Sequence, residues 1–251
     1  LPISADDIVT KGYDGTMDAN QMLDYAESGI FEISQARQKG QYSHIRDVLV
    51  ENLAIIDRAE QMDGGLTGIT TGFSKLDEMT SGMQKSDLII LAARPAMGKT
   101  AFALSLARNA AVKGKASVMI FSLEMAKEQL TQRLLSMESK VDLQTLKTGR
   151  LERRDWDDLN VALDILSNSN IHIDDTAGIS IMEMKSKCRR LKAEAGLDLV
   201  IIDYLQLMNP EGKADSRTQE ISVISRNLKL LARELDCPVL VLSQLSRAPE
   251  Q

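Results

Sequence analysis

The sequence has few aromatic residues, cysteines and histidines, and each shortage narrows the classes of protein it can encode. Phe, Trp and Tyr together make up 4% of the 251 residues, so aliphatic side chains and 12 Met must fill most of the core. Cys188 and Cys237 have no histidine nearby, which leaves too few ligands for a zinc site. We expect two thiols in the core, with a disulfide as the alternative. His44 and His172 lie beside no candidate catalytic partner, so we expect structural roles for both.

Long apolar runs and an excess of basic residues are also missing. No run approaches the roughly 18 apolar residues that span a membrane, so we expect no membrane segment. The first residues show no basic region followed by an apolar one, so we expect no signal peptide and a cytoplasmic location. The net charge of −6 argues against a uniformly basic surface that wraps a nucleic acid. A local basic channel remains compatible with this charge, because binding depends on where the charges lie.

The first quarter of the chain is polar and follows helical periodicity. Apolar residues recur at helical spacing within 18–39, a break follows at 40–43, and a second amphipathic stripe begins at Ile45. Two short helices cannot bury both stripes by themselves. Either they pack on the domain that follows, or one of them docks on a neighbouring subunit, and the pattern does not decide between the two. A glycine-rich junction at 63–68 marks the expected domain boundary.

Beyond this junction, short apolar runs alternate with helical patterns. The runs lack a clean apolar–polar alternation, as expected for strands covered on both faces. This succession predicts an α/β domain with a mainly parallel sheet. The expected strands are 88–92, 117–122, 171–174, 198–203 and 239–243. The expected helices lie around 101–113, 126–138, 153–167, 180–194 and 217–236.

The stretch from Asp87 to Ala110 carries the most information about function. An apolar run leads into a loop ending in Gly98-Lys99-Thr100, and a helical pattern follows, which is the layout of a phosphate-binding P-loop with Ala93 in place of its first glycine. In such a loop, backbone N–H groups surround the phosphates, the lysine adds positive charge and the threonine hydroxyl binds Mg²⁺. The following helix directs its positive end to the same place. We therefore expect ATP and Mg²⁺ as cofactors. The expected nucleotide-binding residues are Ala93, Arg94, Pro95, Ala96, Met97, Gly98, Lys99, Thr100 and Ala101.

Three polar residues lie at or just after the ends of other predicted strands, at the edge of the sheet where ligands bind in open α/β folds. Asp203 ends the run 199–202, as in a Walker B strand whose carboxylate holds Mg²⁺. Glu124 either orients an attacking water or favours the start of the next helix. Gln244 either senses the γ-phosphate or is a satisfied amide at a strand end.

Five ordered motifs together resemble the DnaB family of bacterial replicative DNA helicases. The resemblance extends from about residue 15 to the end of the chain. Ala93 matches this family, so the departure from the general P-loop pattern becomes a RecA-like signature. The motifs are A-A-R-P-A-M-G-K-T at 92–100, F-S-L-E-M at 121–125, I-D-Y-L-Q-L-M at 202–208, S-R-T-Q-E-I-S at 216–222 and L-S-Q-L-S-R at 242–247.

The resemblance implies a RecA-like P-loop ATPase core with a mainly parallel sheet, preceded by an α-helical linker region. It divides the chain into the end of an N-terminal helical region at 1–40, a linker helix and junction at 41–65, and a truncated ATPase domain at 66–251. It also implies a homo-hexameric ring that uses ATP to translocate on single-stranded DNA and to unwind a duplex from 5′ to 3′. Primase and a helicase loader are the implied partners. The linker helix would dock on the next subunit of the ring.

Residue roles follow from the same resemblance. Lys99 and Thr100 bind phosphate and Mg²⁺, and Asp203 holds Mg²⁺. Glu124 activates the hydrolytic water, and Gln244 couples the γ-phosphate state to the loops that bind DNA. The segment 209–215 would line a central channel, with a solvated surface loop as the alternative. Its candidate contacts to the DNA backbone are Lys213 and Arg217.

The chain departs from the family in length. It begins with Leu, lacks most of the family's N-terminal domain, and stops before the family's arginine finger, which acts in trans. Such a finger is worth about three to five orders of magnitude in rate, so we expect this chain alone to bind ATP and to hydrolyse it slowly. Strong DNA-stimulated turnover by the isolated chain would contradict this expectation. Two alternatives stay open: another RecA-like DNA-dependent ATPase, such as a recombinase or recombination factor, and a nucleotide-binding assembly scaffold without catalysis.

Overall fold

The structure is a computed structural model that describes residues 5–13, 18–36, 44–60, 66–208 and 217–245. Its residues group into two compact units. One comprises Leu1–Gln61 with Met182–Lys187, and the other comprises Met62–Ile181 with Cys188–Gln251. The first unit contains the helices α1 (Ala5–Tyr13), α2 (Ala19–Ala36) and α3 (Ile45–Glu60), so the helical character expected for this part of the chain is confirmed.

Helix α3 carries an unusual amount of exposed apolar surface. Seven of its apolar side chains are between 40% and 69% exposed, although a helix of a globular domain normally buries one apolar stripe. Isolated apolar residues on a surface need no explanation, but many exposed apolar residues on one helix mark a surface that binds another element. The exposed side chains are Ile45, Val48, Leu49, Val50, Leu53, Ile55 and Ile56.

The second unit is built on a five-stranded sheet in the order β1-β5-β4-β2-β3, and every neighbouring pair of strands is parallel. All five predicted strands are confirmed within one residue at each end. Strands β2 and β4 are buried along their full length, which explains why their sequences are continuous apolar runs. The strands are β1 (Leu88–Ala93), β2 (Val118–Ser122), β3 (Ile171–Asp174), β4 (Leu199–Asp203) and β5 (Val239–Gln244).

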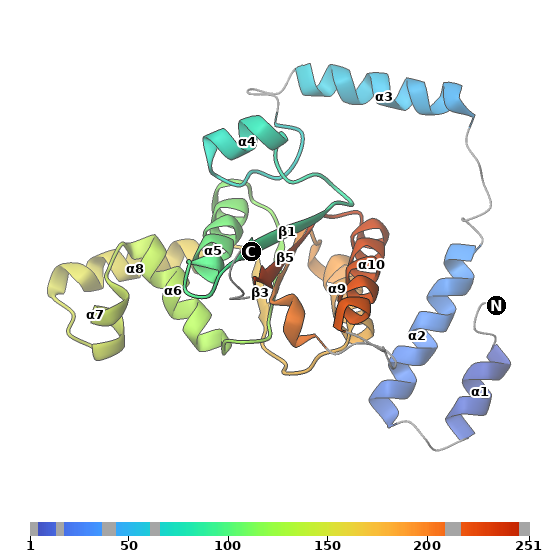
Figure 1. The fold of residues 1–251 in the computed structure, drawn as a ribbon. Coiled ribbons are helices and arrows are strands. Elements are labelled where there is room, and N and C mark those ends of the chain that lie inside the picture. Colours follow the sequence, from blue (N-terminus) through green and yellow to red (C-terminus); the bar gives the residue numbers. More distant parts are fainter. Residues whose placement is uncertain (1–4, 14–17, 37–43, 61–65, 209–216, 246–251) are drawn as a thin grey trace, which may run out of the picture. The chain divides into compact units, whose positions relative to one another are not determined.

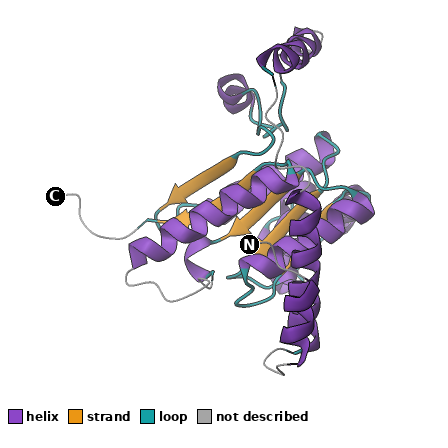
Figure 2. Cartoon of the chain, turned by 90° about the vertical axis from the view of Figure 1, so that its right-hand side faces the viewer, coloured by secondary structure: helices purple, strands orange, loops and turns teal. Residues whose placement is uncertain are grey.

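Helices connect successive strands and cover both faces of this sheet (Figures 1 and 2). Figure 1 shows α5 (Lys99–Arg108) and α10 (Arg217–Leu235) on opposite sides of β1 and β5. Helix α5 connects β1 to β2 in one direction across the sheet, and α10 connects β4 to β5 in the opposite direction. Because crossovers between parallel strands are right-handed, the two helices must lie on opposite faces of the sheet. A π-helical turn, η2 (Asn109–Lys113), continues α5. The other predicted helices are also confirmed, as α6 (Lys127–Ser139), α8 (Arg153–Ser167) and α9 (Ile181–Ala195).

Three short elements were not predicted: α4 (Ser74–Thr80), α7 (Leu143–Thr148) and the 3₁₀ turn η3 (Leu205–Leu207). Neither α4 nor α7 has a buried residue, so neither has an apolar stripe that periodicity could reveal. The start of α7 depends on a side-chain cap instead, since the Asp142 carboxylate accepts hydrogen bonds from the N–H groups of Gln144 and Thr145.

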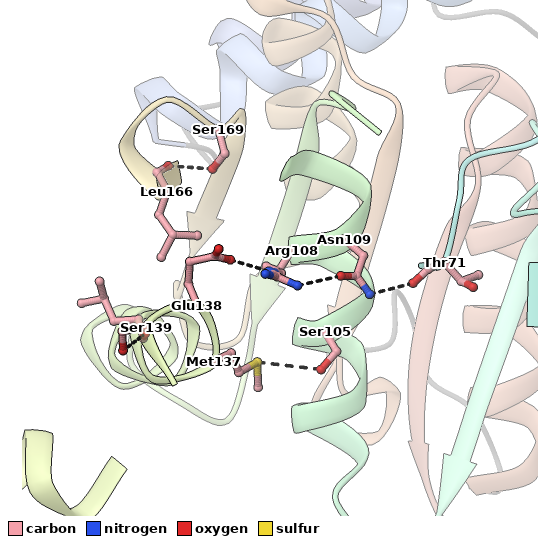
Figure 3. A network of polar contacts seen from close by, with 10 residues as sticks. Thr71, Ser105, Arg108, Asn109, Met137, Glu138, Ser139, Leu166 and Ser169 are labelled. Atoms are coloured by element: carbon pink, nitrogen blue, oxygen red, sulfur yellow. Dashed lines mark hydrogen bonds and ion pairs between the residues drawn. The ribbon is translucent and has the colours of Figure 1, made fainter. Parts of the chain in front are cut away.

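A network of polar contacts fixes the carboxyl end of α5 (Figure 3). Arg108 donates from Nε to Glu138 Oε2 of α6 at 2.5 Å and from Nη1 to Asn109 Oδ1 at 3.0 Å. Asn109 in turn donates from Nδ2 to the carbonyl of Thr71 at 3.1 Å. Asn109 is 6% exposed and the Glu138 side chain 8% exposed, so water screens these contacts little. The network therefore ties α5 both to α6 and to the segment that precedes β1.

Both cysteines are free thiols in the core, as predicted. Burial raises the pKa of each thiol, that of Cys237 to about 11. Within the described part of the chain, no helix is long and apolar enough to cross a membrane.

Asp77 of α4 organises the segment that leads into β1. Its carboxylate accepts hydrogen bonds from the Thr71 N–H at 2.8 Å, the Thr71 hydroxyl at 2.6 Å and the Thr70 hydroxyl at 2.7 Å. Burial raises the pKa of Asp77, but these hydrogen bonds together lower it by a larger amount, so the pKa lies below its ordinary value. The carboxylate therefore stabilises the fold above its unfolded-state pKa, and this stabilisation is lost as the pH falls through the folded-state pKa.

We expect Asp77→Ala to lower the free energy of unfolding at neutral pH by about 1–3 kcal/mol, because it leaves several donors without their acceptor. Urea denaturation of both proteins at neutral and acidic pH measures this difference, which should shrink as the pH falls. Asp157→Ala, at an exposed position on α8, is the control and should have little effect. An effect of Asp77→Ala that is equally large in acid would contradict the role of the charge.

Candidate functional site

The predicted P-loop connects the end of β1 at Ala93 to the start of α5 at Lys99. Two of its residues adopt positive φ angles, Ala96 at 62° and Gly98 at 84°. Gly98 is the N-cap of α5, and a side chain would strain the backbone there. A Cβ atom at Gly98 would meet no atom within 4 Å, so the loop is open on that side to a bound group.

A cavity of about 400 Å³ lies over this loop and brings together three of the sequence-predicted regions. Glu124 after β2 and Gln244 at the end of β5 line it together with the loop. Met97 does not line the cavity and is 73% exposed. A second cavity, of about 370 Å³, lies beside β1, but its walls are mostly apolar. The lining residues of the first cavity are Ala93, Arg94, Pro95, Ala96, Gly98, Lys99, Thr100, Ala101, Glu124, Met125, Arg133 and Gln244.

Asp203 meets the two polar residues of the loop that were predicted to act with it. The Thr100 hydroxyl donates to Asp203 Oδ2 at 2.6 Å, and Lys99 Nζ lies 3.6 Å from Asp203 Oδ1. Asp203 is 4% exposed, and within the described residues its Oδ1 has no hydrogen-bond partner. A buried carboxylate oxygen without a hydrogen bond calls for a nearby cation, and Lys99 supplies one.

Glu124 lies on a turn that the end of β2 holds in place. The N–H of Leu123 donates to the carbonyl of Asp203 at 2.7 Å, and the Ser122 hydroxyl donates to the carbonyl of Met125 at 2.6 Å. Helix α6 begins only at Lys127, so Glu124 precedes it by three residues. The acidic residue in the first turn of α6 is Glu128, which leaves Glu124 exposed at the cavity. This placement favours a role toward a bound ligand over a role in starting the helix.

Comparison with known proteins identifies the family. A family model described as the DnaB-like helicase C terminal domain matches residues 68–251. The chain belongs to the DnaB-like helicase family. The replicative DNA helicase DnaB of Geobacillus stearothermophilus is 49% identical over 249 residues, which cover 99% of this chain and 55% of the relative. The replicative DNA helicase DnaC of Bacillus subtilis (strain 168) matches with the same identity and coverage.

Solved structures agree with this assignment. The ATPase domain of G40P matches with a TM-score of 0.76 and 43% identity, over 82% of this chain and 73% of that one. The structure of a DnaB-like replicative helicase and its interactions with primase matches with a TM-score of 0.79 and 39% identity, over 97% of this chain and 56% of that one. The α/β fold and the resemblance to the DnaB family are thus confirmed. The chain spans about 55% of the length of the two bacterial helicases.

A DnaB-family ATPase domain binds nucleotide, and the cavity over the P-loop is the candidate place for it. The DNA contacts predicted from the sequence are not tested by this geometry. Lys213 lies outside the described residues, and Arg217 is the first residue of α10.

Sequence reasoning missed Arg133 and Tyr204. Arg133 reaches the cavity over the P-loop from α6, and the ring centroid of Tyr204 lies 4.2 Å from Lys99 Nζ. A cation this close to an aromatic ring is attracted to it, so Tyr204 helps to hold the lysine beside Asp203. The only signal for Arg133 was its place in a helix that starts at the carboxyl end of β2, because such a helix keeps its first turns near the site.

We expect Arg133→Ala to weaken nucleotide binding by about tenfold or more, because a guanidinium group that binds phosphate contributes a charge-assisted hydrogen bond. Titration with a fluorescent ATP analogue measures the dissociation constant. Arg150→Ala removes an exposed arginine between α7 and α8 and serves as the control. Equal dissociation constants for Arg133→Ala and the wild type would show that this arginine lines the cavity without binding the nucleotide.

Proposed function

We propose that this chain is the motor part of an ATP-dependent replicative DNA helicase. It binds ATP with Mg²⁺ and couples hydrolysis to movement on single-stranded DNA and to duplex unwinding, from 5′ to 3′ as its family implies. The observation that carries this proposal is the Thr100–Asp203 pair, joined by a hydrogen bond of 2.6 Å next to a cavity that Lys99, Glu124 and Gln244 line. A P-loop, an acidic residue at the end of the Walker B strand and a polar residue at a neighbouring strand end are parts that phosphoryl transfer uses.

The residues present fit a magnesium ion. Thr100 offers a hydroxyl oxygen and Asp203 a carboxylate, which are the hard oxygen ligands that Mg²⁺ prefers. Asp203 Oδ1 has no hydrogen bond within the described residues and lies 3.6 Å from Lys99 Nζ, so this carboxylate oxygen has room for a second cationic partner. Thr100 and Asp203 would hold the ion, directly or through water. When bound, Mg²⁺ neutralises the negative charge that develops on the phosphate oxygens.

The remaining residues of the site have roles that their positions support. The loop N–H groups and the start of α5 bind phosphate oxygens, because the first N–H groups of a helix have no intrahelical partner. Lys99 adds a positive charge next to them. Glu124 lines the cavity from a fixed turn, so its carboxylate can accept a hydrogen bond from the attacking water and take its proton. Gln244 lines the same cavity and can hydrogen-bond to the γ-phosphate.

The assembly we propose is a homo-hexamer in which the nucleotide lies between subunits. Region 1–40 ends an N-terminal helical domain, 41–65 forms a linker, and 66–251 forms the ATPase domain. The exposed apolar face of α3 supports its role as the helix that docks on the next subunit. Six subunits share one DNA strand, so a few contacts per subunit, with Lys213 and Arg217 as candidates, are compatible with the acidic net charge.

Primase and a helicase loader complete the proposed partners. One structurally similar helicase has been described in its interactions with primase, which supports extending this partner to the present chain. The loader follows from the family resemblance alone.

The experiment that tests the proposed function measures phosphate release from ATP by the full-length protein, with and without single-stranded DNA. We expect hydrolysis that single-stranded DNA accelerates. Omitting Mg²⁺ should abolish it. A protein that binds ATP but does not hydrolyse it under any of these conditions would be a nucleotide-binding scaffold, and the proposed function would be wrong.

A further inference from the structure

A second glutamine, Gln206, holds the backbone of Gln244. Gln206 lies in η3, three residues after Asp203 at the end of β4. Its Nε2 donates to the carbonyl of Gln244 at 3.0 Å and to the Ser243 hydroxyl at 3.0 Å, and its Oε1 accepts from the N–H of Gln244 at 3.2 Å. One side-chain amide therefore binds both backbone groups of the residue proposed to sense the γ-phosphate.

These contacts replace strand pairing at a place where the sheet ends. On one side, β5 pairs with β1 up to Gln244, opposite Ala93. On the other side, the pairing of β5 with β4 stops at Val241, opposite Ile202. The Gln206 amide offers one donor and one acceptor to Gln244, as a backbone peptide group would. Only Asn and Gln side chains carry an amide that can do both.

The turn that carries Gln206 is itself fixed in the core. Leu205 is 3% exposed and Met208 2% exposed, so the residues on either side of Gln206 and Leu207 are packed. A displacement of the Gln244 backbone would therefore act, through the Gln206 side-chain amide, on the packed turn η3. The segment assigned to DNA binding by the family resemblance begins at Asn209, directly after Met208 in the sequence.

We propose that Gln206 is a positioning residue that couples the nucleotide site to the chain that follows β4. The Gln206 amide links η3 to the backbone of Gln244. A shift of either one therefore acts on the other. This inference rests on the proposed function, in which Gln244 responds to the γ-phosphate. Coupling between two ligands is reciprocal, so the same contact that passes the nucleotide state toward the DNA also passes DNA binding back to the nucleotide site.

The test compares the affinity of the full-length protein for a labelled oligothymidylate in the presence of a non-hydrolysable ATP analogue and of ADP. The ratio of the two dissociation constants measures the coupling. Gln206→Met preserves the length of the side chain but can neither donate nor accept these hydrogen bonds. We expect it to reduce the ratio by about tenfold, toward one. A merely structural role would weaken binding in both nucleotide states and leave the ratio as it is.

Two further variants sharpen the test. Gln206→Glu retains an acceptor for the Gln244 N–H but has no donor for the Gln244 carbonyl or the Ser243 hydroxyl, so we expect the same loss of coupling. If Gln206→Met does not fold, the ratio of dissociation constants measured for Gln206→Glu takes its place. Gln129→Met changes an exposed glutamine on α6 and should leave the ratio at its wild-type value.

The outcomes separate this inference from the proposed function. If the wild type shows a nucleotide-dependent DNA affinity and both Gln206 variants retain it, the inference is wrong and the proposed function stands. If the wild type neither hydrolyses ATP nor binds the oligonucleotide, the proposed function fails and the inference fails with it.

Discussion

Glu124→Gln is expected to reduce ATP turnover by about 10²- to 10⁴-fold, the contribution typical of a positioned general base. Glutamine has nearly the same size as glutamate but cannot take a proton from water. Glu124 is exposed at the cavity over the P-loop, so the substitution should change neither the fold nor the affinity for ATP appreciably. Phosphate release and nucleotide titration on the same preparations separate the effect on turnover from any effect on binding.

The turn that presents Glu124 makes this expectation specific. The Leu123 N–H donates to the carbonyl of Asp203, and the Ser122 hydroxyl donates to the carbonyl of Met125, so hydrogen bonds hold the residues on both sides of Glu124. Glu128→Gln is the matched control, because Glu128 is an exposed glutamate in the first turn of α6 and does not line the cavity. Unchanged turnover in Glu124→Gln would refute its assignment as the base.

Lys99→Ala is expected to impair both nucleotide binding and turnover. In the proposed function Lys99 presents a positive charge to the phosphates, and removing one preorganised group that stabilises the transition state costs about 10²- to 10³-fold in turnover. The lysine side chain is 11% exposed and its partner Asp203 5%, so alanine also leaves a buried carboxylate without its cation. We therefore expect a lower melting temperature without nucleotide as well.

The matched control for Lys99→Ala is Lys113→Ala. Lys113 is exposed at the end of the π-helical turn that continues α5, so its removal alters the charge of the same helical segment away from the site. Thermal melting should be near the wild-type value for this control. Wild-type turnover in Lys99→Ala would show that the loop does not carry the chemistry.

The sheet could be predicted because its strands have a simple physical signature. A strand such as β4 is buried on both faces, so its sequence, Leu199 to Ile202, is entirely apolar and ends at a polar residue. Helices with one buried face were predictable because their apolar residues recur at helical spacing. Helix α4 could not be predicted, since it has no buried residue and its place depends on Asp77 binding Thr70 and Thr71.

Some residues of the candidate site could likewise be predicted from the sequence and others could not. Asp203, Glu124 and Gln244 were predictable because they lie at or just after the ends of strands, and parallel strands bring their carboxyl ends to one edge of the sheet. Arg133 and Gln206 were not, because each reaches the site through a side chain on an element whose orientation only the folded structure provides. The roles of all these residues remain predictions.

Strand separation on a forked DNA duplex by the full-length protein tests the central claim most directly. The proposed motor should release the displaced strand only when ATP and Mg²⁺ are present, and neither Lys99→Ala nor Glu124→Gln should release it at a comparable rate. Strand separation that both substitutions leave intact would contradict the claim, as would a wild type that hydrolyses ATP rapidly but never separates the strands.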